Sequence, residues 1–390
     1  MLASLKEPPE RVAAAAAPSA SDMDELLRDI RARRKEFEAQ RFISPDIIQS
    51  FKKIGVYRAL VAKRFGGDEK SPAEFCELIE TLSGADGSAG WVASFGIGGV
   101  YLAALPVATL EKLYANGPDV VFAGGIFPPQ PAELVEGGYK VSGRWSWGSG
   151  SMGAEVVGAG ILPKNADGSG LPRMAVMPRD KVQIAPNWDV MGLLGTGSHD
   201  IVVKDVVVPE EWTFVRGGAS SLDTPLYRYP TLSFAAQVLT VVGLGIARAA
   251  IDEVIGMAVG RASVTGAPNL GERVYVQLEM AKIDAELRAA RAWFYQAIDD
   301  VWQVLLAGGK PSDQQVSMLR LSTTHASRVA AEVTRRAQMV SGGSGVYESC
   351  PLAAQVRDAQ MITQHAFMGD ITYQNAGAMM FGLKPLPGYL

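Results

Sequence analysis

The sequence predicts an α+β fold made mostly of helices, with a β-barrel or sandwich of antiparallel strands between two helical parts. Apolar residues recur at helical spacing up to about residue 118 and again from about residue 231. Between these parts, short β-rich runs alternate with turns rich in Gly, Pro, Asn and Asp. We therefore expect an N-terminal helical domain at 21–118, a β domain at 119–215 and a C-terminal four-helix bundle at 216–390, after a flexible arm at 1–20.

Capping residues predict the N-terminal helices. Ser71-Pro72-Ala73-Glu74 combines an N-cap serine, a proline at the first helical position and an acid at the third. A similar start at Ser21 predicts a helix through Gln40. A further helix is expected from Ser88 to about Leu105, and its small, apolar residues on every side indicate that it is buried.

The later elements follow from the same periodicities. Strands are expected at 139–142, 155–161, 173–177 and 201–208. Helices are expected at about 231–262, 270–308, 312–341 and 352–381. Four helices of this length favour a bundle, and glycine-containing turns separate the last three of them.

Composition excludes several classes of protein. The 390 residues are 48% hydrophobic and 20% charged with a net charge of −4, which argues against nucleic acid as a partner. Two cysteines and three scattered histidines favour neither a disulfide framework nor a metal centre. Without a run of about 18 apolar residues or a signal-peptide layout, we expect a cytoplasmic protein that does not bind membranes.

The stretch Gly143–Gly150 is the most informative in the chain. Trp145 and Trp147 stand two apart, so on a strand they point the same way. Hydroxyls at Ser146 and Ser149, with glycine on both sides of Ser149, place polar groups and close backbone beside a flat apolar wall. This pattern suits a planar aromatic ligand, although a twisted hairpin with core tryptophans explains it equally well.

Other candidates carry both a functional and a structural interpretation. Gly342-Gly343-Ser344-Gly345 could expose backbone amides to an anion or simply end a helix. Arg261, followed by Ser263, could pair with a phosphate or lie in solvent. His365 could shuttle protons or be a structural group. Gly192–Asp200 is interpreted as a turn, since it does not follow a strand and open a helix as a dinucleotide loop does.

Taken together, these features resemble the acyl-CoA dehydrogenase superfamily, and most closely the oxygenase components of two-component flavin-dependent monooxygenases. The resembling stretches are Gly84–Trp91, Gly137–Gly150, Gly192–Pro209, and Gly342–Leu352 with Arg357-Asp358 and Gln364-His365. The resemblance implies a homotetramer that receives reduced FAD or FMN from a separate NAD(P)H-using reductase. It also implies that O2 forms a flavin C4a-hydroperoxide, which transfers one oxygen atom to a small electron-rich aromatic substrate.

The resemblance also implies roles for individual residues. Ser149 and His365 are the expected catalytic residues beside the flavin ring. The expected cofactor-binding residues are Trp145, Trp147, Ser149, Gly150, Arg261, Ser263, Gly342 and Gly343. Position and size suggest a substrate pocket of Trp91, Phe95, Tyr101 and Phe367.

Two departures from the family pattern bear on the substrate. Gln364-His365 stands where dehydrogenases carry a glutamate, which disfavours an acyl-CoA dehydrogenase but leaves Glu253 open as a base. Phenol-hydroxylating members have a histidine shortly after the Gly90-Trp91 position, and here there is none. Because an indole is nucleophilic without deprotonation, we expect an indole derivative. A phenol served by His365, a dehydrogenase and a catalytically inert scaffold are the alternatives.

Overall fold

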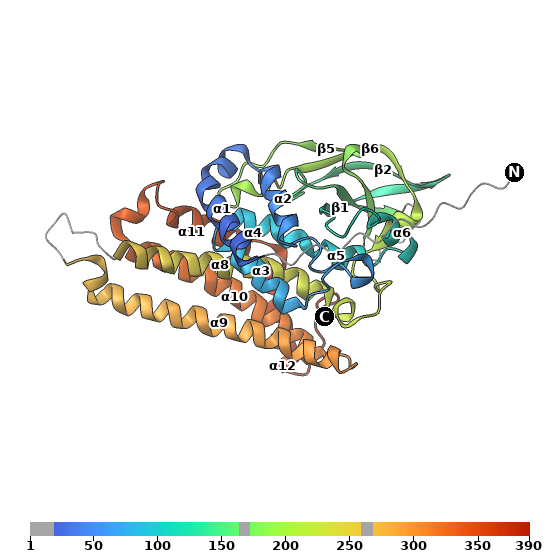
Figure 1. Cartoon of the computed structure of the whole chain (residues 1–390). Coiled ribbons are helices and arrows are strands. Elements are labelled where there is room, and N and C mark those ends of the chain that lie inside the picture. Colours follow the sequence, from blue (N-terminus) through green and yellow to red (C-terminus); the bar gives the residue numbers. More distant parts are fainter. Residues whose placement is uncertain (1–18, 164–171, 259–267) are drawn as a thin grey trace.

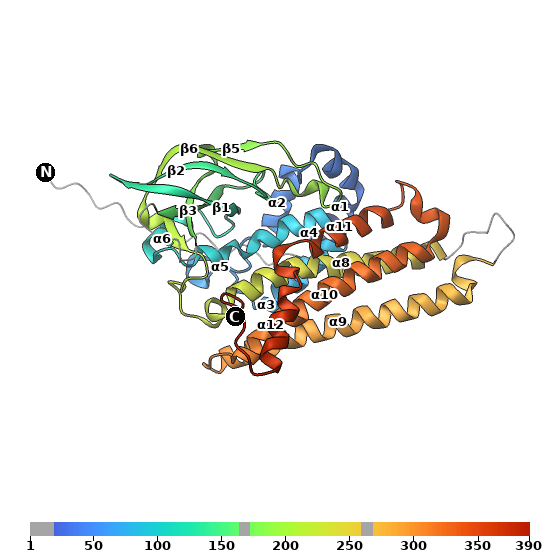
Figure 2. The same cartoon turned by 180° about the vertical axis from the view of Figure 1, so that it is seen from behind.

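The computed structural model describes residues 19–163, 172–258 and 268–390, so most of the predicted arm at 1–20 lies outside the described residues. Helices come first in the chain, seven strands follow, and long helices complete it (Figure 1). The sheet lies on one side of the molecule and the longest helices on the other, with the N-terminal helices between them (Figures 1 and 2). The predicted mixed, mostly helical fold class is confirmed.

Of the N-terminal helices, the one capped by Ser71 begins where its capping residues predict, whereas the first has Ser19 and not Ser21 as its N-cap. The N-terminal helices are α1 (Ala20–Gln40), α2 (Pro45–Lys53), α3 (Pro72–Ser83), α4 (Gly87–Ser94), α5 (Gly98–Leu102) and α6 (Val107–Leu113). The Ser71 hydroxyl accepts from the Glu74 amide while the Glu74 carboxylate accepts from the Ser71 amide, which is a complete capping box.

The helix expected from Ser88 to Leu105 is instead two short helices, α4 and α5, joined by a 3₁₀ turn. Glycines explain the break. A Cβ on Gly96 would stand 2.6 Å from the Val56 carbonyl oxygen, and one on Gly99 would stand 2.9 Å from that of Leu60. The glycines therefore allow close backbone packing, at a cost in helix propensity.

The middle of the chain forms one seven-stranded sheet. The strands are β1 (Phe122–Val135), β2 (Gly138–Trp145), β3 (Val156–Pro163), β4 (Arg173–Pro178), β5 (Val182–Ala185), β6 (Asp200–Val208) and β7 (Thr213–Val215). They lie in the order β5-β6-β2-β1-β3-β4-β7. The expectation of purely antiparallel strands is wrong at one place, because β1 pairs with β3 in parallel.

That parallel pair determines where the central stretch of the sequence lies. β2 and β3 border β1 on opposite sides, so the chain must cross over β1 to connect them. Residues 146–155 make this crossover. Trp147, Ser149 and Gly150 therefore belong to a connecting loop and not to a strand.

The C-terminal part contains α7 (Pro225–Arg228), α8 (Thr231–Ala258), α9 (Val274–Leu306), α10 (Asp313–Val340), α11 (Leu352–Thr363) and α12 (Ile371–Met380). α8, α9 and α10 run along one another, and α12 crosses them (Figure 2). The fourth expected helix, 352–381, is broken in two between α11 and α12. His365 lies at this break with an extended backbone, φ −66° and ψ 140°.

α8 forms the centre of the helical core. Its residues are apolar on nearly every side and pack against α3, α10 and α11. By length and composition it is the one described helix that could cross a membrane, but 89% of its most apolar window is buried inside the protein. Such burial is typical of the core helix of a folded domain.

Candidate functional site

The two tryptophans of the central stretch point in different directions. Trp145 ends β2, is 0% exposed, and donates from Nε1 to the Gly160 carbonyl at 2.8 Å. Trp147 has a left-handed backbone, φ +62°, and an indole that is 67% exposed. The prediction that both rings line a ligand is therefore wrong for Trp145, which packs in the core of the sheet. Only Trp147 offers an open ring face.

Ser149 lies at one end of a chain of buried hydroxyls. Its Oγ accepts from Trp91 Nε1 at 3.2 Å and shares a 2.6 Å hydrogen bond with Ser198, which shares one of 2.7 Å with Thr196. Because Thr196 donates to the Leu193 carbonyl, Ser198 must donate to Thr196, and Ser149 to Ser198. Ser149 Oγ then keeps one lone pair that can accept from a ligand N–H.

The loop 192–199 holds this chain in place, and the sequence pattern assigned it only a turn. Gly150 donates to the Thr196 carbonyl, Gly195 donates to the Ser88 hydroxyl on α4, and Leu193 donates to the Asp358 carboxylate on α11. The loop thus links all three parts of the molecule. The Gly-Thr-Gly-Ser run was the available signal for Ser198 and Thr196, but a turn accounts for it equally well.

His365 contacts the same cluster through the ring of Trp91. Its ring centroid lies 6.0 Å from that of Trp91 and 4.8 Å from that of Phe367. Its Nδ1 accepts from the Phe367 amide at 3.3 Å, which assigns the ring proton to Nε2. Burial, with a smaller effect from the charge of Arg216, lowers the pKa of His365 to about 4. His365 is therefore a neutral donor at pH 7.

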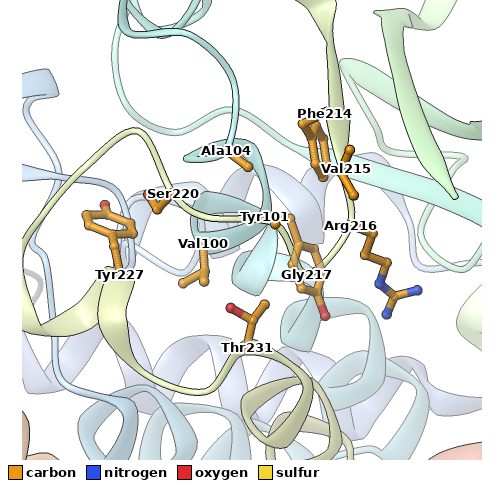
Figure 3. A pocket seen from close by; sticks show the side chains of 11 residues that line it. Val100, Tyr101, Ala104, Phe214, Val215, Arg216, Gly217, Ser220, Tyr227 and Thr231 are labelled. Carbon is orange, nitrogen blue, oxygen red and sulfur yellow. The ribbon is translucent and has the colours of Figure 1, made fainter. Parts of the chain in front are cut away.

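The predicted substrate residues are partly brought together. Trp91 and Phe367 both contact His365. The guanidinium of Arg216 lies against the rings of both Phe367 and Tyr101, and Figure 3 shows Arg216 beside Tyr101. A cavity of about 20 Å³ opens beside Tyr101 and Arg216, which is room for a single water. Phe95 packs against the helical core and takes no part in the ring contacts of the described residues.

The other predicted cofactor contacts have three outcomes in the structure. Arg261 and Ser263 lie outside the described residues. Gly342 and Gly343 form a 3₁₀ turn after α10, with open space where their side chains would be, and all of α11 separates them from His365. Gly150 has φ +71° beside Ser149. Contacts of Gly342 and Gly343 with the far end of a cofactor stay a prediction.

Asp358 is an acid with a strongly altered pKa close to the site. Its carboxylate is packed against Gly87 and accepts from the Leu193 amide at 2.5 Å. Burial and then the nearby Asp86 carboxylate raise the pKa of Asp358 to about 8. The protonated acid is thus the form that the fold stabilises at this junction.

This altered pKa predicts a pH-dependent stability. A carboxyl whose pKa rises from 3.8 to about 8 on folding stabilises the protein fully below the lower pKa, and loses that contribution progressively until the pH has risen through the upper one. Asp358→Asn keeps the acceptor for Leu193 and cannot ionise. We expect the stability of this variant relative to the parent to be roughly 4 kcal/mol greater at pH 9 than at pH 5.

Chemical denaturation at both pH values measures this difference. Asp189→Asn, at a side chain that is 99% exposed, is the matched control and should change stability equally little at either pH. Equal effects of Asp358→Asn at pH 5 and pH 9 would contradict the assignment.

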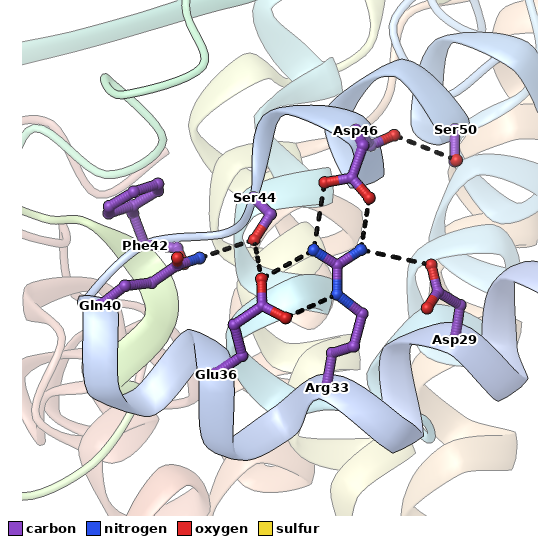
Figure 4. Close-up of polar contacts among 8 residues, drawn as sticks. All are labelled: Asp29, Arg33, Glu36, Gln40, Phe42, Ser44, Asp46 and Ser50. Carbon is purple, nitrogen blue, oxygen red and sulfur yellow. Dashed lines mark hydrogen bonds and ion pairs between the residues drawn. The ribbon is translucent and has the colours of Figure 1, made fainter.

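A denser polar network lies on α1 and α2, and it is structural. Arg33 forms ion pairs with Asp29, Glu36 and Asp46, and Ser44 donates to Glu36 (Figure 4). Arg33 lowers the pKa of Glu36 to about 2. Its acids are paired with this one arginine, so the network joins two helices and leaves no acid or base poised for chemistry.

The groups around Ser149 fit a flavin. The open Trp147 ring offers a flat apolar face, and strained backbone of this kind is concentrated at functional sites. Ser149 Oγ can accept from a ring N–H, and neutral His365 can donate from Nε2. Such uncharged partners match the carbonyls and ring nitrogens of an isoalloxazine.

Comparison with known proteins gives a consistent result. The family model "Acyl-CoA dehydrogenase, C-terminal domain" matches residues 237–370. The chain is 62% identical over 97% of its length to the indole-3-acetate monooxygenase of Pseudomonas putida, covering 97% of that protein. It is 28% identical over 92% of its length to the oxygenase component of the FADH(2)-dependent resorcinol hydroxylase of Rhizobium sp., covering 93% of it.

A solved structure shares the whole architecture. The 3-HSA hydroxylase from Rhodococcus sp. RHA1 superposes with a TM-score of 0.87 at 25% identity, with 95% of this chain and 98% of that chain covered. The identity to curated relatives and the shared fold extend over nearly the full length of the chain. The chain therefore belongs to the flavin-dependent monooxygenases built on the acyl-CoA dehydrogenase fold, as an oxygenase component.

Proposed function

We propose that this protein oxygenates indole-3-acetate, using reduced FAD or FMN from a separate NAD(P)H-dependent reductase. The substrate is the one named for the Pseudomonas putida relative. When bound, reduced flavin supplies the two electrons with which O2 places one oxygen atom on the indole C2–C3 bond and releases the other as water. The protein's own side chains must bind the flavin and the substrate, donate hydrogen bonds to them and exclude water.

The setting of the His365 ring is the observation that carries this substrate assignment: the side chain is half-buried, and its Nδ1 accepts from the Phe367 amide. A phenol reacts far better as phenolate, and losing the base that forms it lowers the rate by roughly 10²–10⁴-fold. With its pKa lowered to about 4 and its proton on Nε2, His365 is a poor base at neutral pH. An indole needs no such base, so the site favours an indole over a phenol.

The described residues supply three functions around the reacting groups. Trp147 offers a ring face for the flavin, while Ser149 accepts from a ring N–H. His365 Nε2 donates to the oxygen that develops negative charge, and fixed donors of this kind act most strongly where water is excluded. Trp91 and Phe367 enclose the substrate ring beside His365.

The assembly is also part of this proposal. Exposed apolar side chains gather at the start of α9, at Val274, Tyr275 and Leu278, and at the end of α12, at Met380 and Phe381. Exposed apolar groups in such number favour contact with further copies of the chain. We propose a homotetramer that works in the cytoplasm. Light scattering after gel filtration measures the mass of the assembly, and hence the number of copies, directly.

Product analysis tests the proposed reaction. The protein is mixed with reduced flavin and indole-3-acetate, and ¹⁸O2 is admitted. We expect a product that carries one labelled oxygen atom, and water as the second product of O2. Hydrogen peroxide without oxygenated indole, together with hydroxylation of a phenol such as resorcinol, would contradict the proposal.

A further inference from the structure

Arg216 places a positive charge beside the aromatic cluster. It follows directly after β7, and its guanidinium carbon lies 5.5 Å from the centroid of the Tyr101 ring and 6.0 Å from that of Phe367. Figure 3 shows the Arg216 side chain next to Tyr101 at the edge of the small cavity. Phe367 in turn lies 4.8 Å from the ring of His365, so this charge borders the proposed substrate position.

A second arginine lies against the same ring. The guanidinium carbon of Arg320 is 5.9 Å from the centroid of Phe367. Arg320 is only 7% exposed, its Nε has no hydrogen-bond partner, and one Nη donates to the Tyr389 carbonyl at 3.3 Å. Burial lowers the pKa of Arg320, because the charged guanidinium is less well solvated there than in water.

Neither arginine has an acidic partner within residues 19–163, 172–258 and 268–390. By contrast, Arg328 pairs with Asp370 at 2.8 Å and Arg291 with Glu80 at 2.7 Å. Two guanidinium groups around one phenyl ring, without a carboxylate, create a positive potential. Its effect reaches His365, since the charge of Arg216 contributes to that residue's lowered pKa. A bound anion would be stabilised here.

We propose that Arg216 is the specificity-determining residue that binds the carboxylate of an arylacetate substrate, whose ring lies among Trp91, His365 and Phe367. The proposal rests on the function proposed above and adds the group that selects an acidic substrate over a neutral indole. A guanidinium suits this role because its planar N–H fork matches the two oxygens of a carboxylate.

Exposure and contacts assign the direct role to Arg216. Arg216 is half-buried and follows the open end of β7, where it is adjacent to Gly217 and Gly218. Arg320 is enclosed, donates to the Tyr389 carbonyl, and stacks on the Tyr389 ring at 5.5 Å. Arg320 therefore adds to the potential from behind Phe367, while Arg216 is placed to touch the ligand.

Paired substrates of equal shape test the assignment. Indole-3-acetate and indole-3-acetamide differ by one charge, so kcat and KM are measured for both with the parent, Arg216→Gln and Arg216→Lys. We expect Arg216→Gln to raise KM for indole-3-acetate by roughly 10- to 100-fold and to leave KM for the amide nearly unchanged. Arg216→Lys, which keeps the charge but loses the fork, should restore part of the difference.

Arg64→Gln is the matched control, because Arg64 also stacks on an aromatic ring, that of Phe65 at 5.1 Å, but lies at the surface beside Glu111. It should leave both KM values unchanged. Equal losses for acid and amide in Arg216→Gln would make Arg216 a packing residue and overturn the proposal. A selective loss in Arg320→Gln, with Arg216→Gln unaffected, would overturn it as well.

A binding measurement separates this inference from the proposed function. Calorimetry of the flavin-loaded protein with phenylacetate and phenylacetamide needs no turnover. If the parent oxidises neither indole, the proposed function fails, while an Arg216-dependent preference for phenylacetate still supports the anion site. If the parent oxidises indole-3-acetate and Arg216→Gln binds acid and amide as the parent does, only the anion site fails.

Discussion

Ser149→Ala is expected to lower the yield of oxygenated product per O2 consumed by roughly 100- to 1000-fold, as does loss of one fixed hydrogen-bonding group in other active sites. Ser149 Oγ connects Trp91 to the hydroxyls of Ser198 and Thr196 and keeps a lone pair for the cofactor. Without it, reduced flavin should still react with O2, and hydrogen peroxide should replace product. Parallel assays of O2 consumed, peroxide and product measure this partition.

The matched control for this change is Ser94→Ala. Ser94 is also a buried serine next to Trp91, but its hydroxyl donates to the Trp91 carbonyl within the helix and not to the site. It should keep the parent's product yield. A Ser149→Ala variant that converts O2 to product as efficiently as the parent would remove Ser149 from the mechanism.

His365→Asn is expected to lower kcat by roughly 100-fold while leaving the fold intact. An Asn side chain can keep the acceptor that Nδ1 offers to the Phe367 amide, since asparagine is a good cap, but it has no group in place of Nε2. The variant therefore removes the Nε2 donor while it keeps the hydrogen bond that stabilises the turn at His365–Phe367. Single-turnover rates measure the effect of losing the donor, and thermal unfolding measures whether the fold is still stable.

The pH profile gives an independent test of the role of His365. Because its pKa is lowered to about 4, the parent's rate should not titrate with this residue between pH 6 and 8. His325→Gln, a histidine that packs on Trp293 in the bundle, is the control and should keep the parent's rate. A rate in the parent that follows a group of pKa near 6.5, and that disappears in His365→Asn, would instead make it an acid–base catalyst.

Local signals explain what the sequence predicted well. The Ser71–Glu74 capping box is complete within four residues, and the turns before α10 and after it contain the expected glycines. The resemblance to the flavin monooxygenases singled out Ser149 and His365, and in the structure both contact Trp91. Short-range chemistry and a whole-chain pattern were therefore enough for the fold class, while the catalytic roles of Ser149 and His365 stay predictions.

Long-range geometry explains what the sequence could not give. The parallel pairing of β1 with β3 turns residues 146–155 into a crossover, so Trp147 leaves the strand and no longer shares a face with Trp145. Arg216 belongs to none of the sequence motifs described above. It becomes notable only when folding places it against Tyr101 and Phe367, with no acidic partner in the part of the chain that the structure describes.

The loop that joins the β sheet to α4 and α11 has a consequence for how the protein loses its structure. Leu193, Gly195 and Thr196 each hydrogen-bond to a different part of the chain. If the sheet, α4 or α11 unfolds alone, the hydrogen bonds that hold this loop beside Ser149 are broken. Partial unfolding that leaves the site around Ser149 intact is therefore suppressed. The enzyme should consequently melt as one cooperative unit despite its three successive segments, and lose activity and structure together.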